Sequence, residues 1–261
     1  MNRFITQLSQ PNRMGVIPFF MLGDPTPEIS LQLIKAAIEQ GVDALELGFP
    51  FSDPMADGPV IQRSAERALR SGCDFATCVE LLQKIRRFAD LPIGLLIYYN
   101  LLLRQGIETT HSQLAAVGID AILAVDLPLE EAAEHELSLQ KHGIGNISLI
   151  APNSDSERAK LLLDHASAFA YVVSSYGITG VRKTLPEDLP QRLAMLKKLN
   201  PAMPLVVGFG ISEASQIKML REAGADAVIV GSAITRLIEE HLGHPEHQIQ
   251  AITQFLNDLK D

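Results

Sequence analysis

The sequence predicts an α/β protein built as a single closed barrel of eight parallel strands and crossover helices, a (β/α)8 barrel. Three observations support this fold class. Short aliphatic or β-branched runs recur eight times, segments with helical spacing separate them, and a glycine-containing phrase repeats at four helix ends. Strands that are apolar throughout are covered on both faces and joined by crossover helices, which is typical of parallel sheets.

The predicted strands are spread evenly along the chain. They cover residues 15–22, 44–48, 93–98, 121–125, 146–150, 170–173, 205–208 and 227–230. This recurrence over the full length favours one barrel domain, residues 1–261, over the alternative of a two-domain doubly wound sheet. No Pro/Ser-rich linker or low-complexity run marks a domain boundary.

Amphipathic helices are predicted where apolar residues recur at 3.6-residue spacing. The clearest cover residues 29–40, 129–141, 156–166, 187–199 and 213–223. We expect a glycine in the left-handed conformation to cap four helix ends before the next strand, at Gly41, Gly118, Gly143 and Gly224. Two extra helices lie outside the repeat: an N-terminal one over residues 2–10 across the barrel floor, and a C-terminal one over residues 245–259.

Composition excludes several classes of protein. With 22 Lys and Arg against 31 Asp and Glu, the formal net charge is -9, and no basic surface for nucleic acid is expected. No apolar stretch reaches the roughly 18 residues of a membrane span, and residues 1–10 do not resemble a secretory signal, so we expect a cytoplasmic protein. The two cysteines and the three C-terminal histidines fit no metal spacing, so no metal is expected.

Carboxylates gather where the strands of such a barrel end, which is where active sites lie. Glu46 interrupts an apolar strand, and burial would raise its pKa toward the range useful for proton transfer. The alternative is an internal ion pair, although the strands contain almost no basic residues. Asp53 and Asp57 follow in the next loop, while Asp24 and Asp126 are either helix caps or participants.

Glycine and serine follow the last two predicted strands, at residues 208–212 and 231–234. Each segment opens a helix, and two converging helix N-termini would bind a phosphate; otherwise both are only caps. A long connection after the sixth strand, residues 174–183, is interpreted as a lid or else as a flexible surface loop. These features predict an enzyme that uses carboxylate acid/base chemistry on a small phosphorylated molecule.

Residues 45–58 resemble the active-site signature of tryptophan synthase alpha subunits, with its Glu-hydrophobic-Gly-x-Pro-Phe-Ser-Asp-Pro-x-Ala-Asp-Gly order intact. The resemblance covers nearly the whole chain, with further matching motifs at residues 18–19, 22–25, 92–96, 126–128, 177–180, 208–212 and 231–234. The chain departs from common family residues at Phe49, Val60, Ser175, Tyr176 and Ile178.

The resemblance implies retro-aldol cleavage of indole-3-glycerol phosphate to indole and glyceraldehyde 3-phosphate in tryptophan biosynthesis, without metal or organic cofactor in this chain. It makes Glu46 the general acid/base, which takes the glycerol hydroxyl proton and protonates the indole ring carbon. It makes Asp57 the acceptor of the indole N–H, and it implies that Tyr98 lies close to Glu46 and that Thr179 bonds Asp57 when the lid closes. The other implied substrate contacts are Phe19, Leu96, Tyr171 and Phe209 for the indole, and Gly180, Gly210, Gly231 and Ser232 for the phosphate.

The resemblance also implies a partner, the pyridoxal-phosphate-dependent beta subunit. In an αββα heterotetramer this subunit consumes the indole through a tunnel, and pyridoxal phosphate is expected only there. Loops carrying Asp53 and Asn100 would lie near the interface. Two alternatives stay open, a free-standing lyase that releases indole and an idle barrel that only activates a beta subunit; the intact Glu46 and Asp57 argue against the second.

Overall fold

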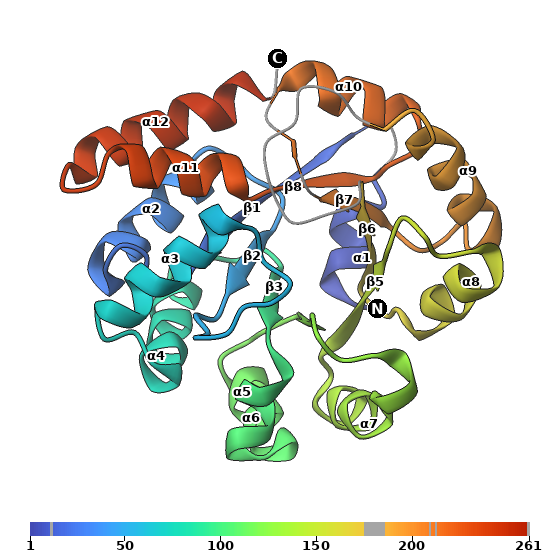
Figure 1. The fold of residues 1–261 in the computed structure, drawn as a ribbon, viewed down its shortest axis with the longest axis horizontal. Helices are drawn as coiled ribbons and strands as arrows, with labels where there is room; N and C mark the ends of the chain where they lie inside the picture. Colours follow the sequence, from blue (N-terminus) through green and yellow to red (C-terminus); the bar gives the residue numbers. More distant parts are fainter. Residues whose placement is uncertain (11–12, 175–185, 209, 212, 260–261) are drawn as a thin grey trace.

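The computed structural model describes residues 1–10, 13–174, 186–208, 210–211 and 213–259. Its eight parallel strands close into one barrel in chain order, with β1 paired to both β2 and β8, which confirms the predicted (β/α)8, or TIM, barrel. Figure 1 shows the strands at the centre and the helices around them. The strands are β1 Gly15–Met21, β2 Leu45–Gly48, β3 Ile93–Ile97, β4 Ala121–Ala124, β5 Gly145–Ile150, β6 Phe169–Val173, β7 Leu205–Gly208 and β8 Ala227–Val230.

The helices form the outer layer and connect successive strands (Figure 1). The five amphipathic segments found by periodicity are all helical, although residues 129–141 divide into a 3-10 turn and a separate helix. The helices are α1 Arg3–Leu8, α2 Pro27–Glu39, α3 Pro59–Arg70, α4 Phe75–Arg86, α5 Tyr99–Gln105, α6 Ile107–Ala116, η1 Leu129–Glu131, α7 Ala133–His142, α8 Ser156–His165, α9 Leu189–Leu199, α10 Ala214–Glu222, α11 Ser232–Glu240 and α12 Pro245–Asp258.

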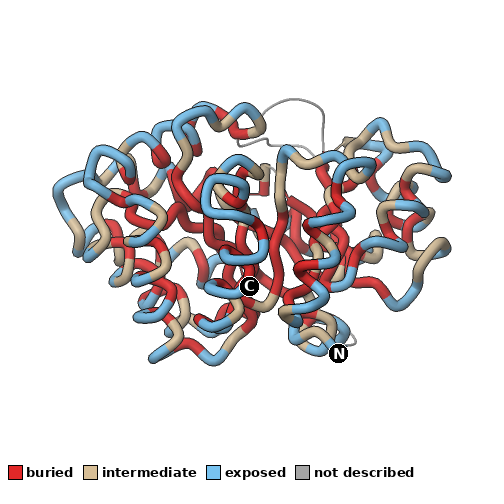
Figure 2. The backbone as a smooth tube through the Cα atoms, turned by 90° about the horizontal axis from the view of Figure 1, so that it is seen from below, coloured by how far each residue is buried: buried red, intermediate tan, exposed pale blue. Residues whose placement is uncertain are grey.

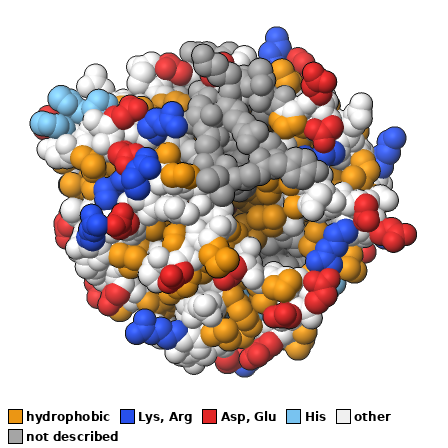
Figure 3. All heavy atoms as spheres, viewed as in Figure 1, with side chains coloured by type: hydrophobic (Ala, Val, Ile, Leu, Met, Phe, Trp, Pro, Cys, Tyr) orange, Lys and Arg blue, Asp and Glu red, His pale blue; other side chains and the backbone are white. Residues whose placement is uncertain are grey.

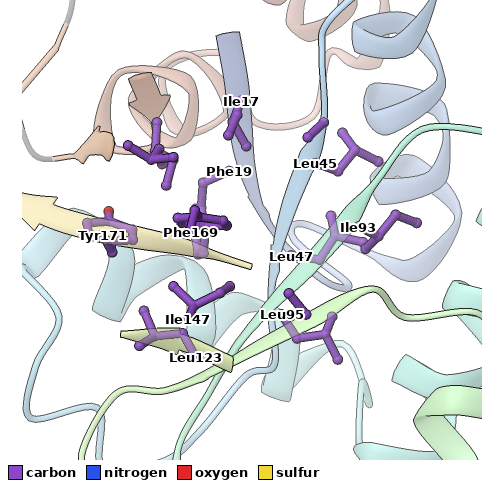
Figure 4. Packing of buried hydrophobic residues seen from close by; sticks show 14 of the residues in the cluster. Ile17, Phe19, Leu45, Leu47, Ile93, Leu95, Leu123, Ile147, Phe169 and Tyr171 are labelled. Carbon is purple, nitrogen blue, oxygen red and sulfur yellow. The ribbon is translucent and has the colours of Figure 1, made fainter. Parts of the chain in front are cut away.

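The core lies in two places, inside the barrel and between the strands and the helices. All residues of β1, β2, β6, β7 and β8 are buried, and Figure 2 shows the buried segments at the centre of the molecule. Phe19, Ile147 and Phe169 fill the space between the strands (Figure 4). Strands covered on both faces explain the continuous apolar runs of the sequence.

The N-terminal helix α1 closes the floor of the barrel, as predicted. Phe4 is buried there, and its ring lies 5.0 Å from that of Phe169. Small residues on the strands make room for it: a Cβ on Gly94 would come within 3.2 Å of the Phe4 ring. Asn2 accepts a hydrogen bond from the N–H of Phe4 and donates one to the carbonyl of Asp120, which ties the helix to the barrel.

Glycines end four helices, as predicted, and all have positive φ angles between 70° and 95°. Gly143 is itself the C-cap of α7, whereas the other three stand one residue after the cap, where a left-handed glycine commonly terminates a helix. The prediction was therefore wrong by one residue at these three ends.

The aspartates that follow three of these glycines share a structural role. Each carboxylate accepts a hydrogen bond from a backbone N–H at the start of the preceding strand and forms an ion pair with a basic side chain. The three sets are Asp43 with Val16 (2.9 Å) and Arg13, Asp120 with Ile93 (2.8 Å) and Arg86, and Asp226 with Leu205 (2.6 Å) and Lys197. The repeated phrase thus satisfies backbone donors at the amino ends of the strands, away from the expected site.

The two cysteines lie on either side of the N-terminus of α4. Cys73 precedes Asp74, which is the N-cap of α4, and Cys78 lies within the first turns of that helix. Both thiols are buried, and their sulfur atoms are 3.5 Å apart. They occupy the positions of a hydrophobic staple, which fixes how the chain enters the helix.

Candidate active site

A cavity of about 340 Å³ opens at the carboxyl ends of the strands. Figure 3 shows hydrophobic side chains around the hollow near the centre of this face. Every strand, or the loop directly after it, contributes to the wall, and α3 adds one side chain. The lining residues are Phe19, Glu46, Ala56, Asp57, Ile61, Leu96, Leu123, Val125, Leu149, Ala151, Pro152, Asn153, Tyr171, Val173, Gly210, Ile211, Ile229, Gly231 and Ser232.

Glu46 lines this cavity from β2. Successive side chains of a strand point to opposite faces, so Glu46 faces the interior while Leu45 and Leu47 face the helices. Glu46 is only 2% exposed, and its Oε1 has no hydrogen-bond partner within the described part of the chain. Burial, reinforced by the negative charge of Asp57, raises the pKa of Glu46 to about 8. Its carboxyl group is therefore mostly protonated at neutral pH.

Asp57 supplies the second carboxyl group, from the loop between β2 and α3. Burial raises its pKa to about 6, while a hydrogen bond from the Tyr98 hydroxyl, 3.0 Å from Oδ2, opposes the shift. The same hydroxyl accepts a hydrogen bond from the N–H of Ala56 at 3.1 Å, so Tyr98 holds the loop as well as the carboxylate. Asp57 is consequently mostly ionised at neutral pH.

Apolar side chains line the same cavity beside the two carboxyl groups and form what we call the apolar slot. The Phe19 ring packs against the backbone of Gly48, where a Cβ would come within 2.7 Å of the ring. Tyr171 packs against Gly208 in the same way, and a methyl group there would overlap its hydroxyl and ring edge. Glycine at the ends of two strands therefore provides the space for two aromatic walls, and Leu96 lies in the lining between strands.

Backbone N–H donors border the cavity beside β8. Helix α11 begins at Ser232, and its N-cap Gly231 has no side chain to accept bonds from the first turn. Gly210, after β7, has a φ of 82° that favours glycine, and it lies in the same lining. The helix after β7, expected over residues 213–223, is α10, which begins at Ala214 with Glu213 as its N-cap.

The N-terminus of α10 is closed by a capping box. The Glu213 backbone N–H is bonded to the Gln216 side chain at 3.1 Å, and the Glu213 side chain accepts a hydrogen bond from the backbone of Gln216. Among the described residues of the last two connections, the cavity is lined by Gly210 and Ile211 after β7 and by Gly231 and Ser232 at the N-terminus of α11. The phosphate site at two converging helix N-termini stays a prediction.

Eight of the predicted site residues line the cavity together: Phe19, Glu46, Asp57, Leu96, Tyr171, Gly210, Gly231 and Ser232. The Tyr98 hydroxyl hydrogen-bonds with Asp57 and Ala56, and its expected closeness to Glu46 stays a prediction. The predicted contacts Thr179, Gly180 and Phe209, and the proposed lid except Ser174, lie outside the described residues.

Asp24 and Asp126, which were expected to be either helix caps or participants, make structural contacts. Asp126 accepts a hydrogen bond from the backbone N–H of Tyr99 at 2.7 Å, in the first turn of α5. Asp24 does not cap α2, whose N-cap is Thr26; it forms an ion pair with Arg67 instead.

Several lining residues were missed by sequence reasoning. Four of them are inward-facing apolar residues of strands, namely Leu123, Leu149, Val173 and Ile229, and most of the others lie in loops after strands. The two-residue period of a strand could have found these four, since Tyr171 on β6 predicts that Val173 faces the same way. Ile61 on α3 had no such signal, because its approach to the cavity depends on helix packing.

The fold and the cavity define a barrel enzyme of the acid/base class, whose substrate has an apolar body and an anionic end. The sequence profile of the tryptophan synthase alpha chain family matches residues 5–261. The chain is 43% identical to the alpha chain of Methanothermobacter thermautotrophicus, covering 94% of this chain and 90% of that one. It is 40% identical to the alpha chain of Photobacterium profundum, covering 97% and 94%. A solved chain from the Pyrococcus furiosus tryptophan synthase α2β2 complex superimposes with a TM-score of 0.87 at 34% identity, covering 94% of this chain and 97% of that one.

The chain belongs to the tryptophan synthase alpha chain family. It is a lyase of tryptophan biosynthesis that cleaves indole-3-glycerol phosphate to indole and glyceraldehyde 3-phosphate. Within the described ranges, no helix is both long and apolar enough to cross a membrane. The same ranges contain no group of three or more His, Cys, Asp or Glu side chains arranged to hold a metal ion.

Proposed function

We propose that Glu46 and Asp57 perform the cleavage as a proton-transferring pair held in opposite protonation states. One observation carries this proposal: two buried carboxyl groups line one apolar cavity, and their pKa values are about 8 and about 6. Between these values Glu46 retains its proton and Asp57 is charged. Carboxyl groups whose environments separate their pKa values commonly divide the roles of acid and charge stabiliser.

The reaction begins with protonation of the indole ring carbon by the Glu46 carboxyl group. The ring becomes a cationic indolenine, and the Asp57 carboxylate accepts a hydrogen bond from its N–H and stabilises the charge. Glu46, now ionised, takes the proton of the glycerol hydroxyl group. The carbon–carbon bond breaks, its electron pair returns to the ring as indole, and the hydroxyl carbon becomes the aldehyde of glyceraldehyde 3-phosphate. Glu46 ends the cycle protonated, as it began.

The rest of the cavity orients the substrate for these transfers. Phe19, Leu96 and Tyr171 would hold the indole, and the phosphate would bind the backbone at Gly210, Gly231 and Ser232. Tyr98 holds Asp57 in place through the hydrogen bond of its hydroxyl. Family resemblance adds Phe209 to the indole contacts, Gly180 to the phosphate contacts, and Thr179 as a partner of Asp57.

We further propose that the chain works in an αββα complex with a tryptophan synthase beta subunit, which uses the indole. The relationship to the alpha subunit of the Pyrococcus furiosus α2β2 complex supports this partner. Exposed side chains near the mouth also support it, since Met55 is 87% exposed and Leu103 on α5 is 48% exposed. Pyridoxal phosphate would belong to that subunit, and this chain would need no cofactor. We place the enzyme in the cytoplasm and propose that residues 1–261 form one domain.

Replacing Glu46 by Gln tests the catalytic assignment. The amide keeps the shape of the side chain but cannot transfer the proton, so indole release should fall by about three orders of magnitude, with substrate affinity within about tenfold. Asp57→Asn should be similarly damaging, because a neutral amide cannot stabilise the cationic ring. Glu80→Gln, at an exposed position on α4, is the matched control. Single-turnover cleavage by the Glu46 variant within about tenfold of the parent would refute the assignment.

Measuring indole release with and without a beta subunit tests the partner. A complex should raise turnover by the alpha chain and should consume the indole without releasing it. Equal turnover in both samples, with no complex in gel filtration, would favour the free-standing lyase. No turnover in either sample, with activation of the beta subunit, would favour the idle barrel.

A further inference from the structure

A network of ion pairs joins three elements behind the active-site cavity. Arg67 of α3 forms a bidentate pair with Asp24, which follows β1, with N–O distances of 2.7 and 2.8 Å. The same guanidinium group contacts Glu239 of α11 at 3.2 Å. Arg63, one turn earlier on α3, binds both carboxylate oxygens of Glu239 at 2.6 and 2.7 Å. We call these four residues the Arg67 network.

The inner part of this network is buried. The Asp24 side chain is 1% exposed and that of Arg67 is 16% exposed, while Glu239 is at the edge with 26%. The fixed, planar fork of an arginine determines the distance and the angle between the groups that it binds. The buried Arg67–Asp24 pair imposes such geometry between α3 and the end of β1. The link to α11 combines the Arg67–Glu239 contact with the bidentate Arg63–Glu239 pair, in which the Arg63 side chain is 47% exposed.

The three joined elements carry residues of the two parts of the proposed site, the part around Asp57 and the part that would bind the phosphate. Helix α3 begins at Pro59, after Asp57 and the N-cap Gly58. Arg63 and Arg67 lie roughly 6 and 12 Å along the axis from Pro59, at about 1.5 Å a residue. Helix α11 begins at Ser232, about 10 Å along its axis from Glu239. Asp24 follows β1, which carries Phe19.

We infer that the Arg67 network fixes the spacing between the Asp57 carboxylate and the phosphate-binding end of α11, so that Arg67 and Glu239 are positioning residues for the reaction. The inference rests on the roles proposed above for Asp57 and Ser232. Neither Arg67 nor Glu239 lines the cavity, so neither touches the substrate there. Their effect is transmitted along the two helices, α3 and α11.

This role has a specific consequence. Indole-3-glycerol phosphate contains both the indole that Asp57 would bind and the phosphate that α11 would bind. Only the binding of the whole substrate therefore depends on the distance between these two parts of the site. Indole alone or glycerol 3-phosphate alone uses one half of the site and should bind equally well at either spacing. A small error in this spacing should strongly lower the rate of cleavage of the whole substrate, because reacting groups must be held close to their productive geometry.

The test compares Glu239→Gln with Glu240→Gln. The first keeps the shape of the side chain but removes the charge that holds both arginines; the second changes the exposed neighbouring residue, which has no ion pair among the described residues. We expect Glu239→Gln to lower kcat/KM for indole-3-glycerol phosphate by about tenfold, and the control by less than about twofold. Calorimetry should give dissociation constants for indole and for glycerol 3-phosphate within about twofold of the parent in both variants.

Arg67→Lys gives a second measurement, since it keeps the charge but loses the bidentate fork. It should also lower kcat/KM without changing binding of the separate ligands. A kcat/KM for Glu239→Gln equal to that of the control would overturn the inference. Parallel loss of turnover and of both separate affinities, together with a lower Tm, would also overturn it, because that pattern indicates general destabilisation. An inactive parent enzyme would instead refute the proposed function.

Discussion

The Tyr98 hydroxyl should determine the acidic side of the pH profile. Its hydrogen bond to Asp57 Oδ2, 3.0 Å long, lowers the pKa of that carboxyl group against the effect of burial. A hydrogen bond to a charged group contributes about 1.5–3 kcal/mol, and one pKa unit corresponds to about 1.4 kcal/mol. Tyr98→Phe should therefore raise the pKa of Asp57 by about one to two units.

In the proposed mechanism, activity depends on ionised Asp57 and protonated Glu46. In the parent enzyme, kcat/KM should rise with pH near 6 and fall near 8, the pKa values of these two groups. In Tyr98→Phe the acidic limb should move up toward the basic limb. At pH 6 the ionised fraction of Asp57 would fall from about a half to about a tenth or less, a fivefold or larger loss of kcat/KM. Near pH 7.5 the loss should be smaller.

The assay is kcat/KM for indole release between pH 5 and 9, measured for the parent, Tyr98→Phe and the control Tyr99→Phe. Tyr99 is the adjacent tyrosine, and its hydroxyl has no hydrogen bond among the described residues. Removing the Tyr98 oxygen also leaves the N–H of Ala56 without its acceptor, so a modest loss of stability, about 1 kcal/mol, should accompany the shift. An acidic limb that stays at the parent position in Tyr98→Phe would refute the role of this hydrogen bond.

Three further predictions concern the slot, the anion end and stability. Gly208→Ala should push the Tyr171 ring into the cavity and weaken indole binding by about tenfold or more, measured by calorimetry, with glycerol 3-phosphate binding nearly unchanged. Ser232→Asp should weaken the binding of glycerol 3-phosphate by a similar factor, because the added carboxylate repels the phosphate, and should leave the binding of indole unchanged. Equal losses of affinity for both ligands would indicate general unfolding. Burial lowers the pKa of His111 to about 4 and of His135 to about 3, so the unfolded chain takes up protons first as the pH falls below 6.5. The free energy of unfolding should then drop by about 2 kcal/mol per histidine between pH 7 and 5. Urea unfolding of His135→Phe should show a smaller drop over this range, and a drop equal to that of the parent would contradict the role of His135.

Local sequence patterns were sufficient to predict the barrel. Apolar runs such as residues 227–230 lie in strands buried on both faces, and the glycine phrases end helices with left-handed residues. Both are short-range properties, because strand burial and helix termination depend on neighbouring residues and on backbone conformation. Glu46 could be found in the same way, since a carboxylate in an otherwise apolar strand stands out without any knowledge of its surroundings.

The different roles of the loop aspartates could not be predicted from local sequence patterns. Asp57, Asp24 and Asp126 look alike in sequence, each in a proline-containing loop after a strand. The structure gives them different partners: the Tyr98 hydroxyl, the Arg67 guanidinium and the backbone of α5. Those partners are 41, 43 and 27 residues away in the chain, and only closure of the barrel brings them together.

The sequence by itself therefore determined the order of strands and helices, the family, and the glutamate in an apolar strand that we propose as the acid/base. Tertiary structure alone decided that Tyr98 bonds Asp57, that Glu213 and Gln216 form a capping box on α10, and that Arg67 joins α3 to α11. The physical reason is the separation along the chain of the residues that determine each property. Secondary structure and burial patterns follow from residues a few positions apart, whereas pKa values, hydrogen-bond partners and the spacing of catalytic groups depend on atoms that only packing brings within a few ångströms.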